Sequence, residues 1–338
     1  MSLPSHRPPP PRSRWSWRSQ AFRGVVYQVV AVVAVGLAIW FLVHNTLENM
    51  RVRGIQSGFD FLLQPAGFDI GESLLPYDSS ESYLKALTVG LSNTLRVAVL
   101  GIGFTTVLGT LLGVGRFSRN ALVRGLCAAY VDVFRNIPLL LQLLMWYLTL
   151  TELLPDALEP WQLGSVFLSK GGLTVPALVW EQGHMGLNLP MKGEFAVEGG
   201  ASITPEFLAV LLGLTVYTAA FVAEVVRAGI QSVPLGQSEA AAALGLSKRQ
   251  EMRLVMLPQA LRVIIPPLTN QFLNLTKNSS LAVAIGYPDV VSISNTTINQ
   301  TGRAVECIAI VMLIYLATSL TTSVLMNRYN ARTTIRER

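Results

Sequence analysis

The chain has 338 residues, of which 51% are hydrophobic and only 14% are charged, whereas a soluble domain carries about 25% charged residues. This composition excludes an ordinary soluble enzyme or a disordered chain and indicates an all-α integral membrane protein. The net charge of +6 gathers at the chain ends and in short connections between apolar runs. The positive-inside rule accounts for that distribution, so no nucleic-acid partner is implied.

Residues 1–24 combine proline, serine and arginine, which predicts a basic cytoplasmic tail. The apolar run 25–43 follows as an N-terminal membrane anchor. A signal peptide is the other interpretation of this start. The run is too long for a signal peptide, and no small-residue cleavage site follows it in FLVHNTLENMRVRG, so an uncleaved anchor is favoured.

Apolar runs of about 20 residues, the length that crosses a bilayer as a helix, occur six times. Asn136 and Pro138 interrupt the third run, and Pro266, Pro267 and Lys277 interrupt the fifth. Neighbouring helices must accommodate such residues, so we expect these two spans to be broken or partly re-entrant. The six predicted spans cover residues 25–43, 88–115, 125–152, 205–230, 263–293 and 303–326.

Arginine and lysine residues set the predicted orientation, because they are enriched in cytoplasmic connections. Arginines precede the first span and follow the last in the tail 327–338, so both termini are predicted to be cytoplasmic. The connections 44–87 and 153–204 are then external, although Arg51 and Arg53 in the first run against the rule. The second is an insertion that contains SVFLSKGGLTVPALVW, which is too short and too rich in glycine to span, so we expect an external flap or a re-entrant piece.

The connection 231–262 contains a charged, alanine-rich segment, GQSEAAAALGLSKRQEMRLVMLPQALR, at residues 236–262, which we call the hairpin. Residues 237–244 strongly favour a helix. Gly245 follows and suits the left-handed turn that closes a helix. The alanines at 240–243 leave little side-chain bulk, so another surface can approach this helix closely.

A second helix is expected after the glycine turn. Ser247 caps it, Gln250 completes a capping box, and Pro258 is expected to mark its end near the next span. The hairpin is thus a compact element on the predicted cytosolic face. On physical grounds alone, an ordinary cytoplasmic loop and a docking element fit it equally well.

A spacing within the hairpin resembles the cytoplasmic loop signature of ABC importer permeases. The matching residues are Glu239, Ala240, Ala241, Gly245, Val255, Leu257 and Pro258. The family usually has isoleucine where this chain has Val255. The resemblance implies that the hairpin is the coupling helix, which inserts into a groove on the ATP-hydrolysing subunit, and that these residues apart from Val255 are the coupling residues.

Other phrases resemble the polar amino-acid permeases, of the histidine, glutamine and glutamate type. The resemblance covers about residues 88–326, which implies the five-helix core of a type I ABC importer preceded by one N-terminal helix. Phrases such as FRNIP, KNSSLAVAIGYPD and NQTGRAVE, with the long insertion, resemble most the general L-amino-acid permeases. The remaining matching phrases are GLSNTLRVAVLGI, FRNIPLLLQL, VYTAAFVAEVVRAGIQSVP and TNQFLNLTKNSSLAVAIGYPDV.

The resemblance implies a permease subunit that moves polar L-amino acids by alternating access in the bacterial inner (plasma) membrane and is not itself an enzyme. The chain has no GxxxxGK[ST] phosphate loop, so ATP and Mg²⁺ are expected on a separate ATPase dimer, with no cofactor or metal on this chain. A second permease subunit and an external amino-acid-binding protein are the other implied partners. The N-terminal helix and the insertion favour a non-identical second subunit, and a homodimer stays open.

Polar residues inside spans are costly and are therefore candidates for the substrate path. Asn270, Asn274 and Lys277 recur at i, i+4 and i+7, on one stripe of the fifth span, where Lys277 can attract a carboxylate. The alternative is that Lys277 only holds a helix end or backbone carbonyls. Glu224 in the fourth span can attract an ammonium group, unless Arg227, three residues on, simply neutralises it.

Asn136 and Gln142 in the third span are further candidates, because the neighbouring Pro138 would free backbone carbonyls. The alternative function is an ion-driven secondary amino-acid carrier, which should show paired repeats in its two halves and no docking hairpin. A scaffold or receptor subunit without transport is a third interpretation, in which charged residues inside spans would have no purpose. The identity of the amino acids carried is not encoded in these patterns.

Overall fold

The computed structural model describes residues 19–52, 54, 57–181, 184–193 and 197–333. The chain divides into two units, Met1–Gly58 and Phe59–Arg338. In the first, helix α1 (Gln20–Val52) is a single apolar helix whose large side chains are exposed, as expected of a surface that faces lipid. The predicted tail 1–18 lies outside the described residues.

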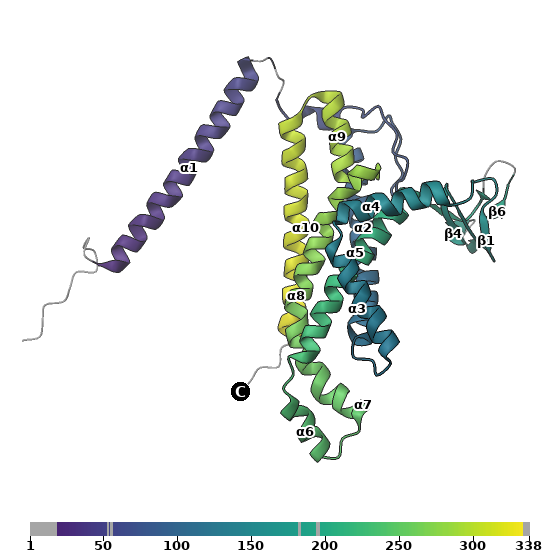
Figure 1. Cartoon of the computed structure of the whole chain (residues 1–338). Helices are drawn as coiled ribbons and strands as arrows, with labels where there is room; N and C mark the ends of the chain where they lie inside the picture. Colours follow the sequence, from purple (N-terminus) through teal and green to yellow (C-terminus); the bar gives the residue numbers. More distant parts are fainter. Residues whose placement is uncertain (1–18, 53, 55–56, 182–183, 194–196, 334–338) are drawn as a thin grey trace, which may run out of the picture. The chain divides into compact units, whose positions relative to one another are not determined.

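Helices α2 (Tyr83–Gly115) and α5 (Pro205–Gln231) form the centre of the second unit, and α8 (Leu257–Asn278) packs against α5. Figure 1 shows these helices side by side with α10 (Ala304–Thr333) in one bundle. Among the described residues, four helices are long and apolar enough to cross a membrane: Phe22–Val52, Tyr83–Gly115, Pro205–Gln231 and Ala304–Arg328.

Two glycines allow α2 and α5 to approach each other closely. A Cβ atom on Gly109 would lie 2.6 Å from Val222 Cβ, and one on Gly113 would lie 2.7 Å from the Ala223 carbonyl oxygen. Membrane helices associate through such small residues, because lipid tails are as apolar as the side chains and provide no hydrophobic driving force between helices. The glycine face of α2 therefore fixes the spacing of the two central helices.

The third predicted span is broken, as expected. Helices α3 (Ala121–Asn136) and α4 (Leu139–Leu148) meet at 104° around Pro138 and together are apolar enough for one span. A π-helical turn, η2 (Thr149–Leu153), extends α4. The sharp bend is the expected effect of a proline, which removes a backbone donor and cannot continue the preceding helix.

The fifth predicted span is interrupted beside Lys277, one of the three residues expected to break it, and not at the two prolines. Helix α8 runs unbroken through Pro266 and Pro267, which lie on its exposed side. The helix ends at Asn278, where the chain tightens into the 3₁₀ helix η4 (Ser279–Ile285), and α9 (Val290–Thr301) follows. The prediction that Pro266 and Pro267 interrupt the helix is thus wrong. The two prolines lack the backbone N–H donors of other residues, but the helix continues past them.

The segment 153–204 folds as short antiparallel strands. Four form one sheet in the order β1-β2-β3-β8, and the other two pairs are β4-β5 and β6-β7. Open strand edges cannot be satisfied where they face lipid, so the strands favour the external flap over the re-entrant piece. The strands are β1 (Trp161–Leu163), β2 (Val166–Ser169), β3 (Gly172–Val175), β4 (Ala177–Glu181), β5 (His184–Asn188), β6 (Met191–Lys192), β7 (Val197–Glu198) and β8 (Ala201–Ile203).

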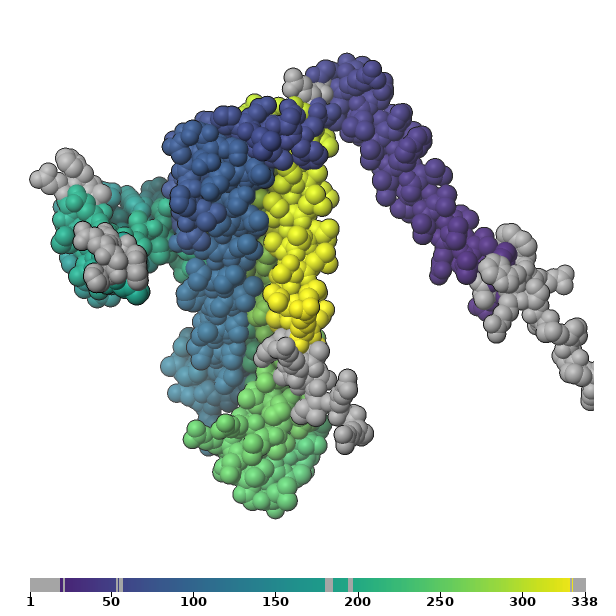
Figure 2. All heavy atoms as spheres, turned by 180° about the vertical axis from the view of Figure 1, so that it is seen from behind, coloured from purple at the N-terminus to yellow at the C-terminus, as the bar shows by residue number. Residues whose placement is uncertain are grey.

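The second unit has two different ends. Helices α6 (Leu235–Ala243) and α7 (Lys248–Glu251) protrude as a separate lobe beyond one end of the bundle (Figures 1 and 2). At the opposite end, α9 lies near the loop 59–82, which contains the short helix η1 (Asp60–Leu63) (Figure 1). The bundle therefore separates a helical lobe from a loop-rich end.

We expect Gly113→Val to destabilise the bundle by at least about 1–3 kcal/mol, because the added side chain would overlap the α5 backbone. Thermal unfolding of the purified protein in detergent should show a lower melting temperature. Gly103→Val on the same helix is the matched control, because no atom lies within 4 Å of a Cβ there. Equal melting temperatures for the two variants would contradict the close α2–α5 contact.

Candidate functional site

The turn of the hairpin has the geometry that its sequence predicts. Gly245 has a φ of +76°. Its N–H donates to the Ala242 carbonyl at 2.9 Å, and the Leu246 N–H donates to the Ala241 carbonyl at 3.1 Å, which is the Schellman arrangement that closes a helix. No atom lies within 4 Å of a Cβ placed on Gly245, so backbone conformation, not space, requires glycine here.

The second helix of the hairpin also starts as predicted. Ser247 and Gln250 form a complete capping box at the start of α7. The chain then passes through a π-helical turn, η3 (Met252–Met256), directly into α8. Pro258 therefore lies in the first turn of α8 and does not end a helix as expected, because proline lacks only the N–H that a first turn leaves unused.

The predicted coupling residues differ in exposure. Glu239 and Ala240 on α6 are exposed, whereas Ala241 is buried at 3% relative exposure against the rest of the lobe. Leu257 is exposed, and Pro258 is partly buried. The exposed end of α6 also carries Leu244, an apolar side chain with no cover in this chain. The tip of the hairpin is thus open to a partner.

The predicted polar stripe of α8 lies on one exposed face. Asn270, Asn274 and Lys277 are all exposed. Leu275 and Thr276, on the other side of the helix, are buried at 0% and 3% relative exposure. The stripe therefore faces away from the core of its own subunit.

Glu224 is not part of this stripe. Its carboxylate pairs with Arg227 on the same helix and accepts a 2.5 Å bond from Arg116 at the end of α2, with Arg135 of α3 at 3.9 Å. Neutralisation by Arg227, one of the two interpretations of its sequence position, is therefore present and is enlarged by two arginines from other helices. The sequence gives no signal for those long-range partners.

Gln142 and Asn136 have different environments at the bend between α3 and α4. Gln142 is buried, and its Nε2 donates to the carbonyls of Phe134 and Ile137, both at 2.9 Å. Asn136 is exposed and donates to the Asp132 carbonyl at 2.6 Å. Gln142 thus satisfies the carbonyls that the break frees and lies away from any open surface.

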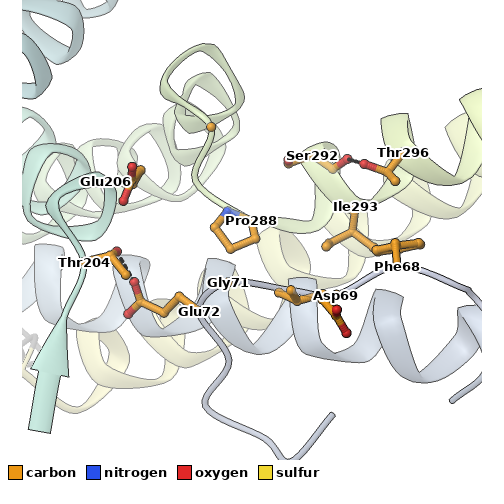
Figure 3. Close-up of a pocket in the computed structure, with 12 residues that line it drawn as sticks. Phe68, Asp69, Gly71, Glu72, Thr204, Glu206, Pro288, Ser292, Ile293 and Thr296 are labelled. Atoms are coloured by element: carbon orange, nitrogen blue, oxygen red, sulfur yellow. Dashed lines mark hydrogen bonds between the residues drawn. The ribbon is translucent and has the colours of Figure 1, made fainter. Parts of the chain in front are cut away.

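A cavity of about 410 Å³ lies at the loop-rich end (Figure 3). Asp69, Glu72 and Glu206 give the cavity a negatively charged lining. Thr204 and two residues of α9, Ser292 and Thr296, add hydroxyl groups to it. Glu72 accepts a hydrogen bond from Thr204 and pairs with Arg96 at 2.5 Å. Sequence reasoning missed Glu72, because its partners are 24 and 132 residues away.

The hairpin and α8 lie in a region that matches a known protein family. The sequence profile of the family described as "Binding-protein-dependent transport system inner membrane component" matches residues 105–335, which include the hairpin and α8. The general L-amino acid transport system permease protein AapQ of Rhizobium johnstonii is 40% identical over 96% of this chain and 96% of its own length. The putative amino-acid ABC transporter permease protein YhdX of Escherichia coli is 42% identical over 99% and 100%.

The fold is also similar to a solved one. The crystal structure of an amino acid ABC transporter with histidines matches with a TM-score of 0.56 and 28% sequence identity, over 74% of this chain and 95% of that chain. The described residues contain no group of three or more histidine, cysteine, aspartate or glutamate side chains placed to hold a metal ion.

We expect Gln142→Leu to lower the free energy of unfolding by about 1–3 kcal/mol, because the carbonyls of Phe134 and Ile137 would lose the donor that the buried Gln142 side chain supplies. Asn136→Ala is the matched control at the same bend and should change it by less than about 0.5 kcal/mol, since Asn136 is exposed. Thermal unfolding in detergent compares the two. A larger effect of Asn136→Ala would show that Gln142 does not hold the bend.

Proposed function

We infer the function of this chain from its family: the chain belongs to the binding-protein-dependent transport system inner membrane components. It is the permease component of an amino-acid ABC importer, a multi-pass membrane subunit without catalytic activity of its own. The prediction from the sequence is thereby confirmed at this level. The alternative of an ion-driven secondary carrier is set aside by the family.

We propose that the hairpin is the contact with a separate ATPase dimer, which carries the ATP and Mg²⁺. The hairpin protrudes from the bundle and exposes Glu239, Ala240 and Leu244 at its tip. Small side chains let a groove on a partner approach the helix backbone, and the exposed leucine offers apolar area to it. Movement of the ATPase subunits then reaches α8 directly, because η3 joins the hairpin to α8 without a loop.

The substrate path is proposed to run along the exposed polar stripe of α8. Exposing Asn270, Asn274 and Lys277 to lipid would cost free energy. Inside a membrane, this polar face of α8 therefore needs another protein surface or a water-filled path against it. A second permease subunit facing this stripe would enclose a polar pathway for alternating access. The N-terminal helix and the insertion 153–204 favour a non-identical second subunit.

Polar L-amino acids are the proposed substrates. The names of the two relatives described above both refer to amino-acid transport. The ammonium group of Lys277 also fits the carboxylate that all amino acids share. Glu224, whose carboxylate is occupied by arginines, is a weaker candidate for binding substrate directly. Gln142 is buried at the bend and Asn136 is engaged with the Asp132 carbonyl, so neither supports the path as strongly as α8.

The proposed topology places the hairpin and both termini in the cytoplasm of a bacterial cell. The insertion 153–204 and the connection between α1 and α2 then lie outside, where an external amino-acid-binding protein docks. The acidic cavity lies on that side, next to Glu72 and Glu206. Basic residues in the hairpin and in the connection after α2 support this orientation through the positive-inside rule.

We expect a Glu239→Arg and Gly245→Val double variant to reach the membrane but to lose the ATPase. The left-handed turn at Gly245 disfavours a β-branched residue by about 1–2 kcal/mol, and the reversed charge alters the exposed tip. The measurement is affinity purification of the tagged permease in mild detergent, with mass spectrometry of the proteins recovered. Lys192→Glu on strand β6 is the control, an exposed charge change far along the chain from the hairpin. Recovery of the ATPase with the double variant would contradict the docking role of the hairpin.

We expect Lys277→Met to reduce the kcat/KM of amino-acid uptake by about 10- to 100-fold, the effect of losing one charge-assisted hydrogen bond. Basal ATP hydrolysis of the assembled transporter should be unchanged, because Lys277 lies in the last turn of α8, far along the helix from the hairpin. Uptake of labelled amino acid into proteoliposomes measures the effect. Arg119→Met, which removes an exposed positive charge in the connection after α2, is the control, and an unchanged uptake in Lys277→Met would remove this residue from the path.

A further inference from the structure

The two helices of the hairpin are held together by very few side chains. Among its residues, Ala241 and Glu251 are the buried ones in the lobe formed by α6 and α7. Glu251, at 6% relative exposure, is a charged residue in this position, and a buried charge is stable only when it is paired and hydrogen-bonded. No feature of the sequence signature refers to it.

Both carboxylate oxygens of Glu251 have partners from within the hairpin. Oε1 accepts a hydrogen bond from the hydroxyl of Ser238 on α6, and Oε2 lies 2.9 Å from Lys248 Nζ at the start of α7. The hydroxyl and the ammonium group hold the pKa of Glu251 below its usual range, so the carboxylate is ionised at neutral pH. The bond from Ser238 joins α6 to α7 across the glycine turn, between two residues 13 positions apart in the chain.

The remaining link between α6 and the following chain is weaker. Gln259 Nε2 on α8 donates to Gln237 Oε1 at 3.4 Å, and both side chains are near the surface. The turn at Gly245 determines how the chain reverses, and Val233, buried against residues of α5 and α8, anchors the chain just before α6 begins. Between these two anchors, about two turns before Gly245, the Ser238–Glu251 bond ties α6 to α7 and so sets its angle.

We propose that Glu251 is a positioning residue for energy coupling: through Ser238 it fixes α6 against α7, and so holds Glu239, Ala240 and Leu244 in the orientation that meets the ATPase. This inference rests on the proposed docking role of the hairpin. Glu251 ends α7 immediately before η3 and α8. A force on α6 is therefore passed through the Ser238–Glu251 bond to the chain that leads into α8.

The test uses the complete transporter, with both permease subunits, the ATPase and the binding protein in proteoliposomes. Ser238→Ala removes the donor alone, Glu251→Ala removes the acceptor, and Glu251→Gln keeps an oxygen that can accept from Ser238. Arg249→Ala is the matched control, because Arg249 is an exposed basic residue in the same turn of α7 and is not one of the two partners of the Glu251 carboxylate. Amino-acid uptake and ATP hydrolysis are measured in the same vesicles.

We expect Ser238→Ala and Glu251→Ala to retain the ATPase but to lower the ratio of amino acid moved to ATP hydrolysed by about tenfold, the effect of losing a hydrogen bond to a charged group. Glu251→Gln should restore most of this ratio, and Arg249→Ala should resemble the wild type. The double variant of Ser238 and Glu251 should be no worse than either single variant, since both remove the same bond.

Limited trypsin digestion gives a second measurement that a change elsewhere in the bundle would not alter. Lys248 and Arg249 lie in the first turn of α7, where opening of the hairpin exposes the backbone. Cleavage in Ser238→Ala should be several-fold faster than in the wild type. Should Glu251→Ala fail to reach the membrane, Ser238→Ala decides, because alanine is a good helix residue at this surface position.

Three results would overturn the inference. Normal coupling in Ser238→Ala and Glu251→Ala, combined with loss of the ATPase in the Glu239 and Gly245 double variant, would reject the Ser238–Glu251 link and leave the docking role in place. A defect in Glu251→Gln as large as in Glu251→Ala, with normal Ser238→Ala, would assign the effect to charge and reject the link as well. If the ATPase is retained and coupling is normal in all of these variants, the docking role itself is wrong.

Discussion

The close contact between α2 and α5 is the constraint on which the rest of the second unit depends. Gly109 and Gly113 leave room for Val222, Ala223 and Val226, so the side chains of Val222 and Val226 pack directly on the α2 backbone. In lipid such packing replaces the hydrophobic effect as the source of helix association. Because α5 leads into the hairpin and α8 packs on α5, this contact sets the base from which both the docking element and the polar stripe are presented.

Polar side chains hold the helices together at the bend and at the end of the bundle. Gln142 satisfies the carbonyls at the bend between α3 and α4, and Glu224 gathers arginines from α2, α3 and α5 at one end of the bundle. Each group is partnered within the subunit, so each stabilises one arrangement of the helices. Asn270, Asn274 and Lys277 differ because their side of α8 is left open.

Local patterns predicted much of this structure because their causes are local. The glycine turn, the capping box and the bend at Pro138 depend on a few neighbouring residues, and all are present. The strands of the insertion were missed because each is only two to five residues long and is stabilised by its neighbours. The partners of Glu224, Glu72 and Gln142 come from other elements, and a proline pair that α8 tolerates looks the same in sequence as one that breaks a helix.

The π-helical turn η3 gives the junction between the hairpin and α8 a specific angular phase. A π turn holds one residue more than an α turn, and one residue corresponds to about 100° of rotation and 1.5 Å of rise along a helix. The five residues Met252–Met256 therefore set the direction in which the lobe points relative to the polar stripe. Two permeases with the same stripe and the same hairpin, but with this turn in α form, would present their hairpins on different sides of the bundle axis.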